Sequence, residues 1–215
     1  VSRQPERSMN SPGLQVLCEA QYNGNRIARV TPLADGIVQR VWHDVGDQVL
    51  AGVVLAELHS AEAALAKSTY LSTLVALEIK KETRTREEKL QQGSISAKKD
   101  YLKAEGEFRM ARLAANNARH KLLNLGLKAE TIAKIERTED ASAILKIYAP
   151  VDGTLIERTA VTGQSVDSGE ALFILADLST RWLILSLPSD RLTQVRVGLP
   201  VEARFDELPG EAILG

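Results

Sequence analysis

The longest regular pattern of apolar positions lies in the middle of the chain. Residues 60–92 contain no glycine or proline and are rich in Ala, Leu, Lys and Glu, which favour a helix. The segment Gly93-Ser94-Ile95-Ser96 interrupts this run, and Ser96 is expected to cap a second helix that begins near Ala97. Gly126 stands where that helix is expected to end. The pattern therefore predicts two long helices joined by a short turn.

Apolar and small residues recur in both predicted helices at alternating steps of three and four. In the second helix the series is unbroken: Tyr101, Ala104, Phe108, Ala111, Ala115, Ala118, Leu122 and Leu125. In the first helix it is weaker and interrupted by Arg86: Leu65, Thr69, Ser72, Ala76, Ile79, Thr83 and Leu90. This spacing is typical of a coiled coil. The two series are expected to face each other in an antiparallel hairpin.

A repeat of short, glycine-punctuated segments flanks the predicted hairpin. Seven positions are identical at an offset of 117 residues: Asp35/Asp152, Gly36/Gly153, Gly46/Gly163, Val49/Val166, Gly52/Gly169, Leu55/Leu172 and Leu58/Leu175. Glycines at this spacing mark tight turns between short strands. Each copy is too small to close a hydrophobic core alone. Residues 31–58 and 147–178 are therefore expected to be neighbours in space.

The two ends of the chain predict further strands. Residues 14–30, with Asn23-Gly24 in the middle, predict a β-hairpin. Beyond Leu178, a strand is expected at 182–187, helical turns at 189–195 and another strand at 200–205. These few strands cannot close a sheet, so the sequence is expected to be a fragment of a longer protein.

Composition and charge exclude several classes of protein. The 215 residues carry 27 Lys and Arg against 28 Asp and Glu, a net charge of −1, which argues against a nucleic-acid partner. The single cysteine, Cys18, excludes an internal disulfide and a cysteine-based zinc site. No apolar run approaches the roughly 20 residues of a membrane span. The sequence contains no motif for nucleophilic or phosphate chemistry, so we expect no enzyme.

The three histidines are the remaining candidates for a metal site. His43, His59 and His120 are far apart in the sequence, and none has a second His or Cys three or four residues away. A protein zinc site normally needs three or four ligands. We expect no bound metal and no cofactor. The pair His43 and His59, at the edges of the first repeat copy, is the alternative.

The nested order of these segments carries a family resemblance. The two repeat copies resemble the halves of a lipoyl or biotinyl domain. With a helical hairpin between the halves and β-barrel strands outside them, the chain resembles a periplasmic adaptor (membrane fusion protein) of a tripartite efflux pump. Residues 122–127, followed by Ile132 and Ile135, are similar to adaptors of the heavy-metal resistance-nodulation-division branch.

The resemblance implies a mixed α and β, elongated, multi-domain fold. It comprises a split lipoyl-like β domain with an inserted coiled-coil hairpin, flanked by a partial β-barrel. The implied segments are the first part of the barrel (1–30), lipoyl-like half 1 (31–58), the α-helical hairpin (59–126), a short helix and connection (127–146), lipoyl-like half 2 (147–178) and the second, incomplete part of the barrel (179–215).

The function implied by the resemblance is a bridge in the periplasm, associated with the inner membrane. One partner would be an inner-membrane efflux transporter and the other an outer-membrane channel. Such adaptors form hexameric rings. In the heavy-metal branch the transported substrate would be a divalent ion such as zinc, cobalt, nickel or cadmium.

The hairpin tip is where the resemblance implies docking onto the outer-membrane channel. Family tips often carry Arg, then Leu four residues later, then Ser after another seven. Arg86 and Leu90 match this spacing, whereas Ser96 comes one residue early. The expected docking residues are Arg86, Leu90, Gly93, Ser94, Ile95 and Ser96.

Two other functions are alternatives to this one. A lipoyl or biotin carrier needs a lysine on an exposed turn, but the first lysine after Leu58 is Lys67, within a predicted helix. This makes the carrier a distant alternative. An adaptor of a drug-efflux or ATP-driven exporter stays open, because the pump largely sets the transported substrate.

Overall fold

The computed structural model describes residue 14 and residues 16–90, 95–204 and 212–214. The chain divides into two compact units. Unit 1 combines residues 1–26 with 178–215, and unit 2 contains residues 27–177. Unit 1 therefore combines two segments that are far apart in the sequence, whereas unit 2 is one continuous segment.

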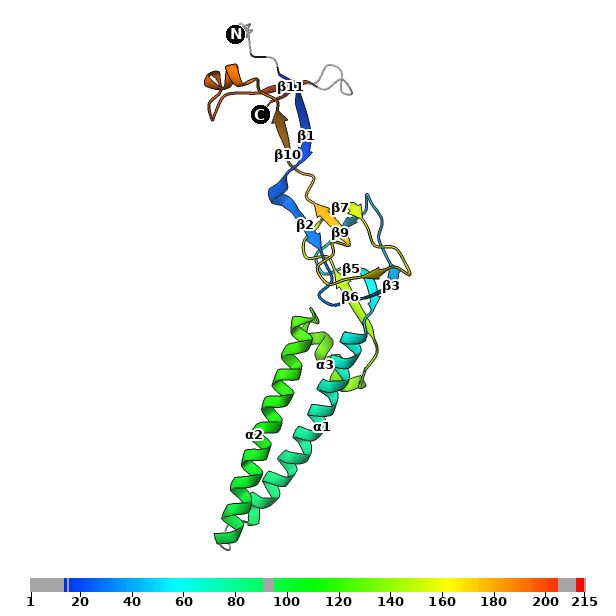
Figure 1. Cartoon of the computed structure of the whole chain (residues 1–215), viewed down its shortest axis with the longest axis vertical. Helices are drawn as coiled ribbons and strands as arrows, with labels where there is room; N and C mark the ends of the chain where they lie inside the picture. Colours follow the sequence, from blue (N-terminus) through cyan, green and yellow to red (C-terminus); the bar gives the residue numbers. More distant parts are fainter. Residues whose placement is uncertain (1–13, 15, 91–94, 205–211, 215) are drawn as a thin grey trace, which may run out of the picture. The chain divides into compact units, whose positions relative to one another are not determined.

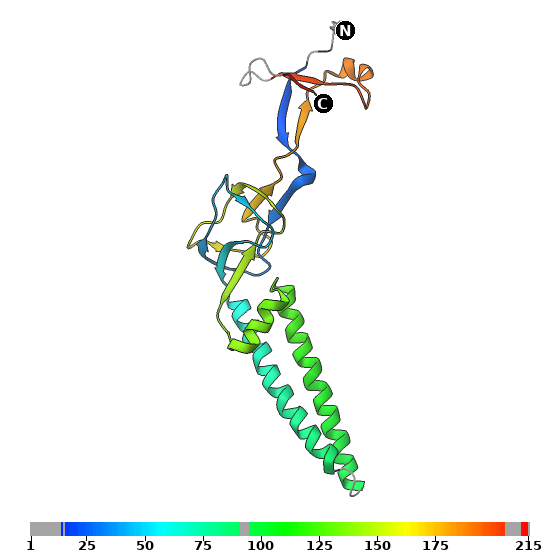
Figure 2. The same cartoon turned by 180° about the vertical axis from the view of Figure 1, so that it is seen from behind.

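Two antiparallel four-stranded sheets form the β part of unit 2 (Figures 1 and 2). One sheet has the order β2-β9-β7-β4 and the other β6-β5-β3-β8. The strands are β2 (Ile27–Val30), β3 (Gly36–Val41), β4 (Gln48–Val49), β5 (Val54–His59), β6 (Ile144–Tyr148), β7 (Gly153–Arg158), β8 (Ser165–Val166) and β9 (Phe173–Ala176). Each sheet therefore contains strands from both copies of the sequence repeat.

The repeat copies interlock through reciprocal hydrogen bonds. The Gly46 N–H donates to the Leu155 carbonyl at 2.8 Å, and at the equivalent positions the Gly163 N–H donates to the Val38 carbonyl at 2.8 Å. The repeated aspartates act in the same way. Asp152 Oδ1 accepts from the Ala51 N–H at 2.6 Å, and Asp35 Oδ1 accepts from the Ser168 N–H at 2.7 Å. The prediction that the two copies pair is confirmed.

The repeated leucines fill the core that the two sheets share. The repeated leucines Leu55, Leu58, Leu172 and Leu175 are fully buried. Leu155 is fully buried beside them. Full burial of a leucine stabilises a fold by about 1.5–3 kcal/mol. The identity between the copies thus marks core positions and turns.

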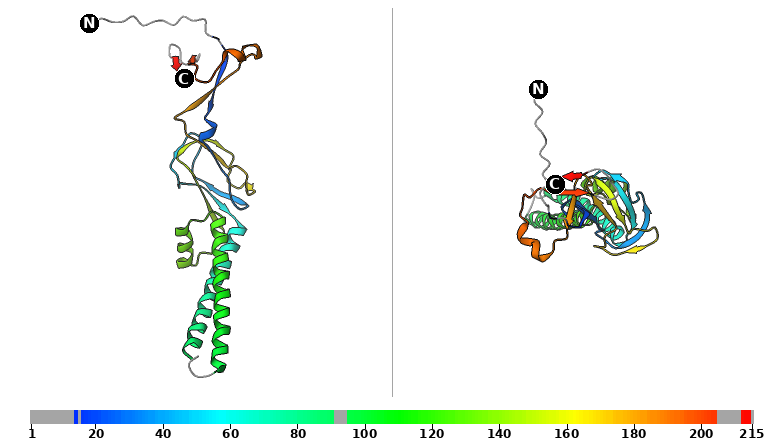
Figure 3. Two further views of the ribbon diagram at one scale, coloured as in Figure 1. Left: turned by 90° about the vertical axis from the view of Figure 1, so that its left-hand side faces the viewer. Right: turned by 90° about the horizontal axis from the view of Figure 1, so that it is seen from above.

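Helices α1 (Ala61–Leu90) and α2 (Ile95–Asn124) run antiparallel and side by side, as Figures 1 and 3 show. Each has 30 residues, a length of about 45 Å. Because α2 begins at Ile95, Ser96 lies inside the helix, and the prediction that it caps the helix is wrong. Gly126 follows the end of α2 with a φ of 82°, as expected of a residue that ends a helix.

The contact between the helices agrees with the series predicted for α2 but not with the series predicted for α1. All eight residues of the series predicted for the second helix are buried or half-buried, which confirms the series; the last of them, Leu125, follows the end of α2. The series predicted for α1 is wrong, because Leu65 and Ile79 are exposed. Helix α1 instead turns Ala63, Ala66 and Tyr70 inward. Nearer the tip, charged side chains of α1 contact α2. A search for apolar residues therefore does not find the contacting positions of α1 in that part.

A short helix, α3 (Ala129–Thr138), packs against the base of the hairpin. Its Ile132 and Ile135 are buried in the common core. The Tyr70 hydroxyl of α1 donates a hydrogen bond to the Glu136 carboxylate of α3. Burial, together with this carboxylate, raises the pKa of Tyr70 to about 12. The short helix expected near these residues is confirmed.

Unit 1 contains two antiparallel strand pairs. Strand β1 (Cys18–Tyr22) pairs with β10 (Arg181–Leu185), and β11 (Glu202–Arg204) pairs with β12 (Ala212–Leu214). A 3₁₀ turn, η2, covers Ser189–Gln194. None of the helices in the described part of the chain has the length and apolar character needed to cross a membrane.

The β-hairpin predicted for residues 14–30 is wrong. Strand β1 pairs with β10, whereas β2 pairs with β9, so residues 27–30 lie in a sheet of unit 2 rather than in the flanking segment. Between the strands, Gly24–Arg26 form a 3₁₀ turn, η1. The Trp182 ring lies against Gly24, where a Cβ would come within 3.1 Å of it. The glycine serves this contact instead of a two-residue hairpin turn.

Candidate docking site at the hairpin tip

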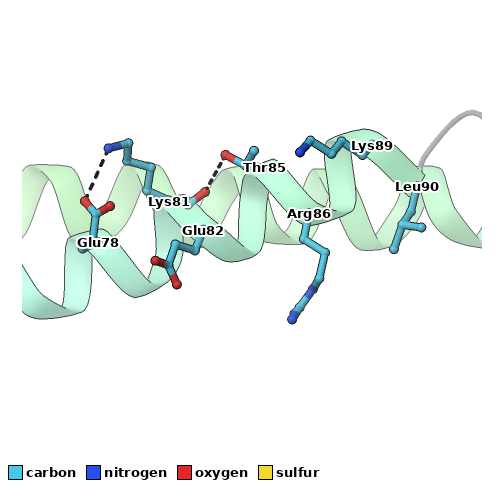
Figure 4. A pocket seen from close by; sticks show the side chains of 7 residues that line it. All are labelled: Glu78, Lys81, Glu82, Thr85, Arg86, Lys89 and Leu90. Atoms are coloured by element: carbon cyan, nitrogen blue, oxygen red, sulfur yellow. Dashed lines mark hydrogen bonds and ion pairs between the residues drawn. The ribbon is translucent and has the colours of Figure 1, made fainter.

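Arg86 and Leu90 lie in the last two turns of α1. Residues four apart share one face of a helix, and both side chains project from the same side of α1 in Figure 4. The Arg86 side chain is 68% exposed and Leu90 is 58% exposed. An exposed guanidinium beside an exposed leucine offers a directional hydrogen-bond donor and an apolar anchor together.

An open hollow runs along α1 beside these two residues. The described residues that line it all belong to α1: Glu78, Lys81, Glu82, Thr85, Arg86, Lys89 and Leu90 (Figure 4). Its charged groups are two carboxylates and three cations. This balance does not suit a single small ion, but it suits the mixed surface of another protein.

Among the residues that the structure describes, the guanidinium of Arg86 has one weak contact. Its Nε lies 3.4 Å from Glu87 Oε1, a long contact at an exposed site. Arginine has five N–H donors in a planar fork. With 68% of the side chain exposed, the described residues leave most of this donor capacity to solvent or to a partner.

Two cross-helix ion pairs, which the sequence analysis missed, support the tip. Arg84 Nε lies 2.6 Å from Glu105 Oε2, and Lys80 Nζ lies 2.7 Å from Glu107 Oε2. Hydrogen bonds from Arg109 and then from Arg84 lower the pKa of Glu105. The hydrogen bond from Lys80 lowers the pKa of Glu107. Pairing opposite charges across the two helices of the expected hairpin would have revealed both contacts.

The structure brings together two of the six expected docking residues. Gly93 and Ser94 lie outside the described residues. The backbones of Ile95 and Ser96 belong to the first turn of α2, and their side chains are not among those described. The candidate site therefore consists of Arg86, Leu90 and the α1 face around them.

His43 and His59 lie at opposite ends of one strand pair. His59 is opposite Ile37, and Ala56 is opposite Val41, so His43 lies beyond the other end of the pair. At about 3.3 Å per strand residue, this separates the two histidines by roughly 15 Å. His43 Nδ1 is instead 3.4 Å from Asp47 Oδ2. Within the described ranges, no three metal-ligating side chains gather into one group.

Lys67 is buried at the base of the hairpin. It is 3% exposed, and its Nζ donates to the Ser142 carbonyl at 2.9 Å and to the Ile144 carbonyl at 3.0 Å. A carrier lysine must be free to swing with its prosthetic group. The geometry of Lys67 therefore argues against a lipoyl or biotin carrier.

The known family that matches this chain is that of the CzcB-like, barrel-sandwich hybrid domain, over residues 26–177. Among curated proteins, the cobalt-zinc-cadmium resistance protein CzcB of Cupriavidus metallidurans is 31% identical over 186 residues, which are 86% of this chain and 34% of that protein. The cation efflux system protein CzcB of an Alcaligenes species gives the same identity and coverage. The chain thus spans about a third of the length of these relatives.

Solved structures show the same fold at lower identity. ZneB from Cupriavidus metallidurans has a TM-score of 0.63 and 24% identity, covering 92% of this chain and 79% of its own. A MacA-MexA chimera with the Pseudomonas aeruginosa MexA α-hairpin domain has a TM-score of 0.65 and 20% identity, covering 94% of this chain and 65% of its own.

A further curated protein, the fatty acid resistance protein FarA of Neisseria gonorrhoeae, is 25% identical over 87% of this chain and 57% of its own length.

Proposed function

Because the chain belongs to the family of CzcB-like, barrel-sandwich hybrid domains, we propose that it is part of a periplasmic adaptor. The adaptor would bridge an inner-membrane efflux transporter and an outer-membrane channel, and we assign it no chemical reaction. The observation that carries this proposal is the exposed pair Arg86 and Leu90 at the far end of a 30-residue helix. It would dock onto the channel.

The finer architecture is part of the same proposal. Residues 31–58 and 147–178 would be lipoyl-like halves, and residues 59–126 a coiled-coil hairpin. Residues 127–146 would connect the hairpin to the second half, and the flanking ends would contribute to an incomplete β-barrel. The reciprocal hydrogen bonds between the repeat copies support the first of these assignments.

We propose divalent heavy-metal ions as the exported substrate. This rests on the curated relatives, which are named for cobalt-zinc-cadmium resistance and cation efflux. The second candidate is an adaptor for export of an organic compound, because FarA, a fatty acid resistance protein, is also similar along most of this chain. Growth of a deletion strain separates the two. Sensitivity confined to zinc, cobalt, nickel or cadmium supports the first, and sensitivity to dyes and detergents alone supports the second.

The docking role of the tip is tested by Arg86→Glu and Leu90→Glu. Each variant is expected to lower metal resistance of a complemented deletion strain toward that of the empty strain, with a loss of channel binding of about tenfold or more. Both positions are exposed, so the melting temperature should stay within about 2 °C of the parent.

Lys134→Glu in α3 is the matched control, because it makes the same charge change as Arg86→Glu at an exposed residue outside the hairpin tip. It is expected to keep resistance near the parent level. If all three variants resist metal equally well, docking through Arg86 and Leu90 is wrong. The assembled ring of adaptor copies is likewise a proposal.

A further inference from the structure

The chain leaves the sheets of unit 2 for the hairpin and returns to them at the same place. Ser60 is the single residue between the end of β5 at His59 and the start of α1 at Ala61. Its N–H donates to the Ala143 carbonyl at 2.8 Å, and His59 pairs with Ile144 at the start of β6. A long hairpin held at one point could pivot there, so a second attachment is needed to fix its direction.

Helix α3, in the returning connection, is attached to α1 nearer the tip than this point (Figures 1 and 2). The buried Tyr70 of α1 donates its hydroxyl hydrogen bond to the Glu136 carboxylate of α3. One turn closer to the base, Lys67 contacts Asp140, which follows α3, at 3.4 Å. The helix from Ser60 to Tyr70 spans about 15 Å. Helix α3 therefore holds α1 at a second point, well away from the first.

The same short helix is also attached to the sheets. At its beginning, Lys128 Nζ lies 4.6 Å from the centre of the Tyr148 ring of β6, and a cation over an aromatic ring is an attractive contact. On the inner side of α3, Ile132 and Ile135 belong to the same buried core as Leu145 of β6. Helix α3 thus contacts both the hairpin and the β part of unit 2.

We propose that α3 is a brace that fixes the direction of the hairpin relative to the sheets. Its contact with Tyr70 holds α1 about 15 Å from the pivot at Ser60, whereas Arg86 lies about 40 Å from the same pivot. A shift of about 2 Å at Tyr70 would therefore become a shift of about 5 Å at Arg86. A guanidinium forms its hydrogen bonds only when the donor is placed within a fraction of that distance.

The brace would act by lowering the cost of docking. A hairpin that already points in one direction loses less conformational freedom on binding than one that pivots freely. The inference rests on the proposed function, because it concerns how the chain presents Arg86 and Leu90 to the channel. Tyr70 and Lys128 are positioning residues, which act through the hairpin and not by touching the partner.

Spin-label distances measured on the whole chain test the brace. Cys18→Ser removes the only cysteine, and Glu157→Cys in β7 and Leu102→Cys in α2 supply exposed sites for the labels. The width of the distance distribution between the two labels measures how widely the hairpin swings relative to the sheets. The parent chain is expected to give a narrow distribution, because α3 holds the hairpin in one direction.

Two variants loosen the brace in different ways. Tyr70→Phe combined with Lys128→Met removes the contacts at both ends of α3 and leaves its buried side intact. Ile135→Gln instead places a polar group in that buried side. Each is expected to widen the distance distribution about twofold or more. With Lys128→Arg in place of Lys128→Met the widening should be smaller, because arginine also stacks on Tyr148. Should Ile135→Gln not fold, the paired variant decides alone.

Two controls separate bracing from stability and from surface charge. Val166→Ala removes buried apolar atoms from β8, at the opposite edge of the sheet from β6. It should lower the melting temperature without widening the distribution. Lys134→Glu changes an exposed residue of α3 itself and should leave both quantities unchanged. An unchanged width in the paired variant, or equal widening from Val166→Ala, would overturn the proposal.

Metal resistance of a complemented deletion strain separates this inference from the proposed function. If the paired variant keeps a narrow distribution while Arg86→Glu lowers resistance, the brace is wrong and docking through Arg86 stands. If the distribution widens while Arg86→Glu leaves resistance intact, the brace stands and docking through Arg86 is wrong. When both are right, the paired variant lowers resistance as well.

Discussion

Lys67 is a buried lysine of α1 that binds the segment between α3 and β6. Besides the two carbonyls, its ammonium contacts Asp140 Oδ2 at 3.4 Å. These acceptors belong to the segment through which the chain leaves α3 and enters β6. Hydrogen bonds from Ser142, with the lysine charge, lower the pKa of Asp140. The Lys67 side chain thus joins the beginning of α1 to the segment that leaves α3 and enters β6.

Replacing this ammonium should be far more harmful than replacing an exposed one. Lys67→Met leaves the two partly buried carbonyls of Ser142 and Ile144 without their donor, which should cost about 1–3 kcal/mol in the free energy of unfolding. Urea denaturation measures the loss. Lys81→Met, whose side chain is 58% exposed, should change the same quantity by less than about 0.5 kcal/mol. Equal losses for both variants would show that Lys67 does not join α1 to the segment between α3 and β6.

Glycines at two positions should respond to alanine in opposite directions. A Cβ at Gly36 would lie 2.7 Å from the His59 carbonyl oxygen, whereas nothing lies within 4 Å of one at Gly106 in α2. Gly36→Ala must displace backbone and should cost about 1–3 kcal/mol. Gly106→Ala should add about 0.5–1 kcal/mol through its better helix propensity. Thermal melts followed by circular dichroism compare them, and a stable Gly36→Ala protein would contradict the close approach of β3 and β5.

At the scale of elements, the sequence pattern predicts which residues of α2 are buried. It does not predict which residues of α1 meet α2, or with which strands β1 and β2 pair. The α2 series could be predicted because its small and apolar residues recur without interruption from Tyr101 to Leu125. The α1 series was predicted wrongly because Lys80 and Arg84 make the contact near the tip. The hairpin expected at Asn23-Gly24 was wrong for a related reason. Local turn chemistry was outweighed by pairing with β9 and β10, which come more than 140 residues later.

Acid should weaken the tip half of the hairpin. The folded state lowers the pKa of Glu105 and Glu107 below their ordinary value of 4.5. Their stabilising effect is therefore complete above pH 4.5 and is lost as the pH falls through the lowered values. The melting temperature of the helical signal is expected to drop over that range. Glu105→Gln cannot titrate and should flatten the drop, and an unchanged pH dependence in this variant would refute the role of the ion pairs.

At the scale of the whole molecule, the sequence allowed the family to be inferred from the order of its parts. The resemblance to heavy-metal adaptors is confirmed by the match over residues 26–177. Of the candidate site, Arg86 and Leu90 could be chosen only through family spacing, because an arginine in a charged helix is ordinary by itself. Their exposure and the support from Arg84 required the position of α2, which periodicity alone does not give.

The interlocked sheets have a consequence for the order in which the chain acquires its structure. Strands β3 and β5 pair with each other, but their other partners, β8 and β6, come only with residues 144–166. The hairpin, by contrast, needs only contacts between adjacent helices. In the folded chain His59 pairs with Ile144 at the base of the hairpin. We therefore expect that formation of the hairpin and α3 brings the distant halves together as a short loop would, so that the inserted helices help the domain that they interrupt to fold.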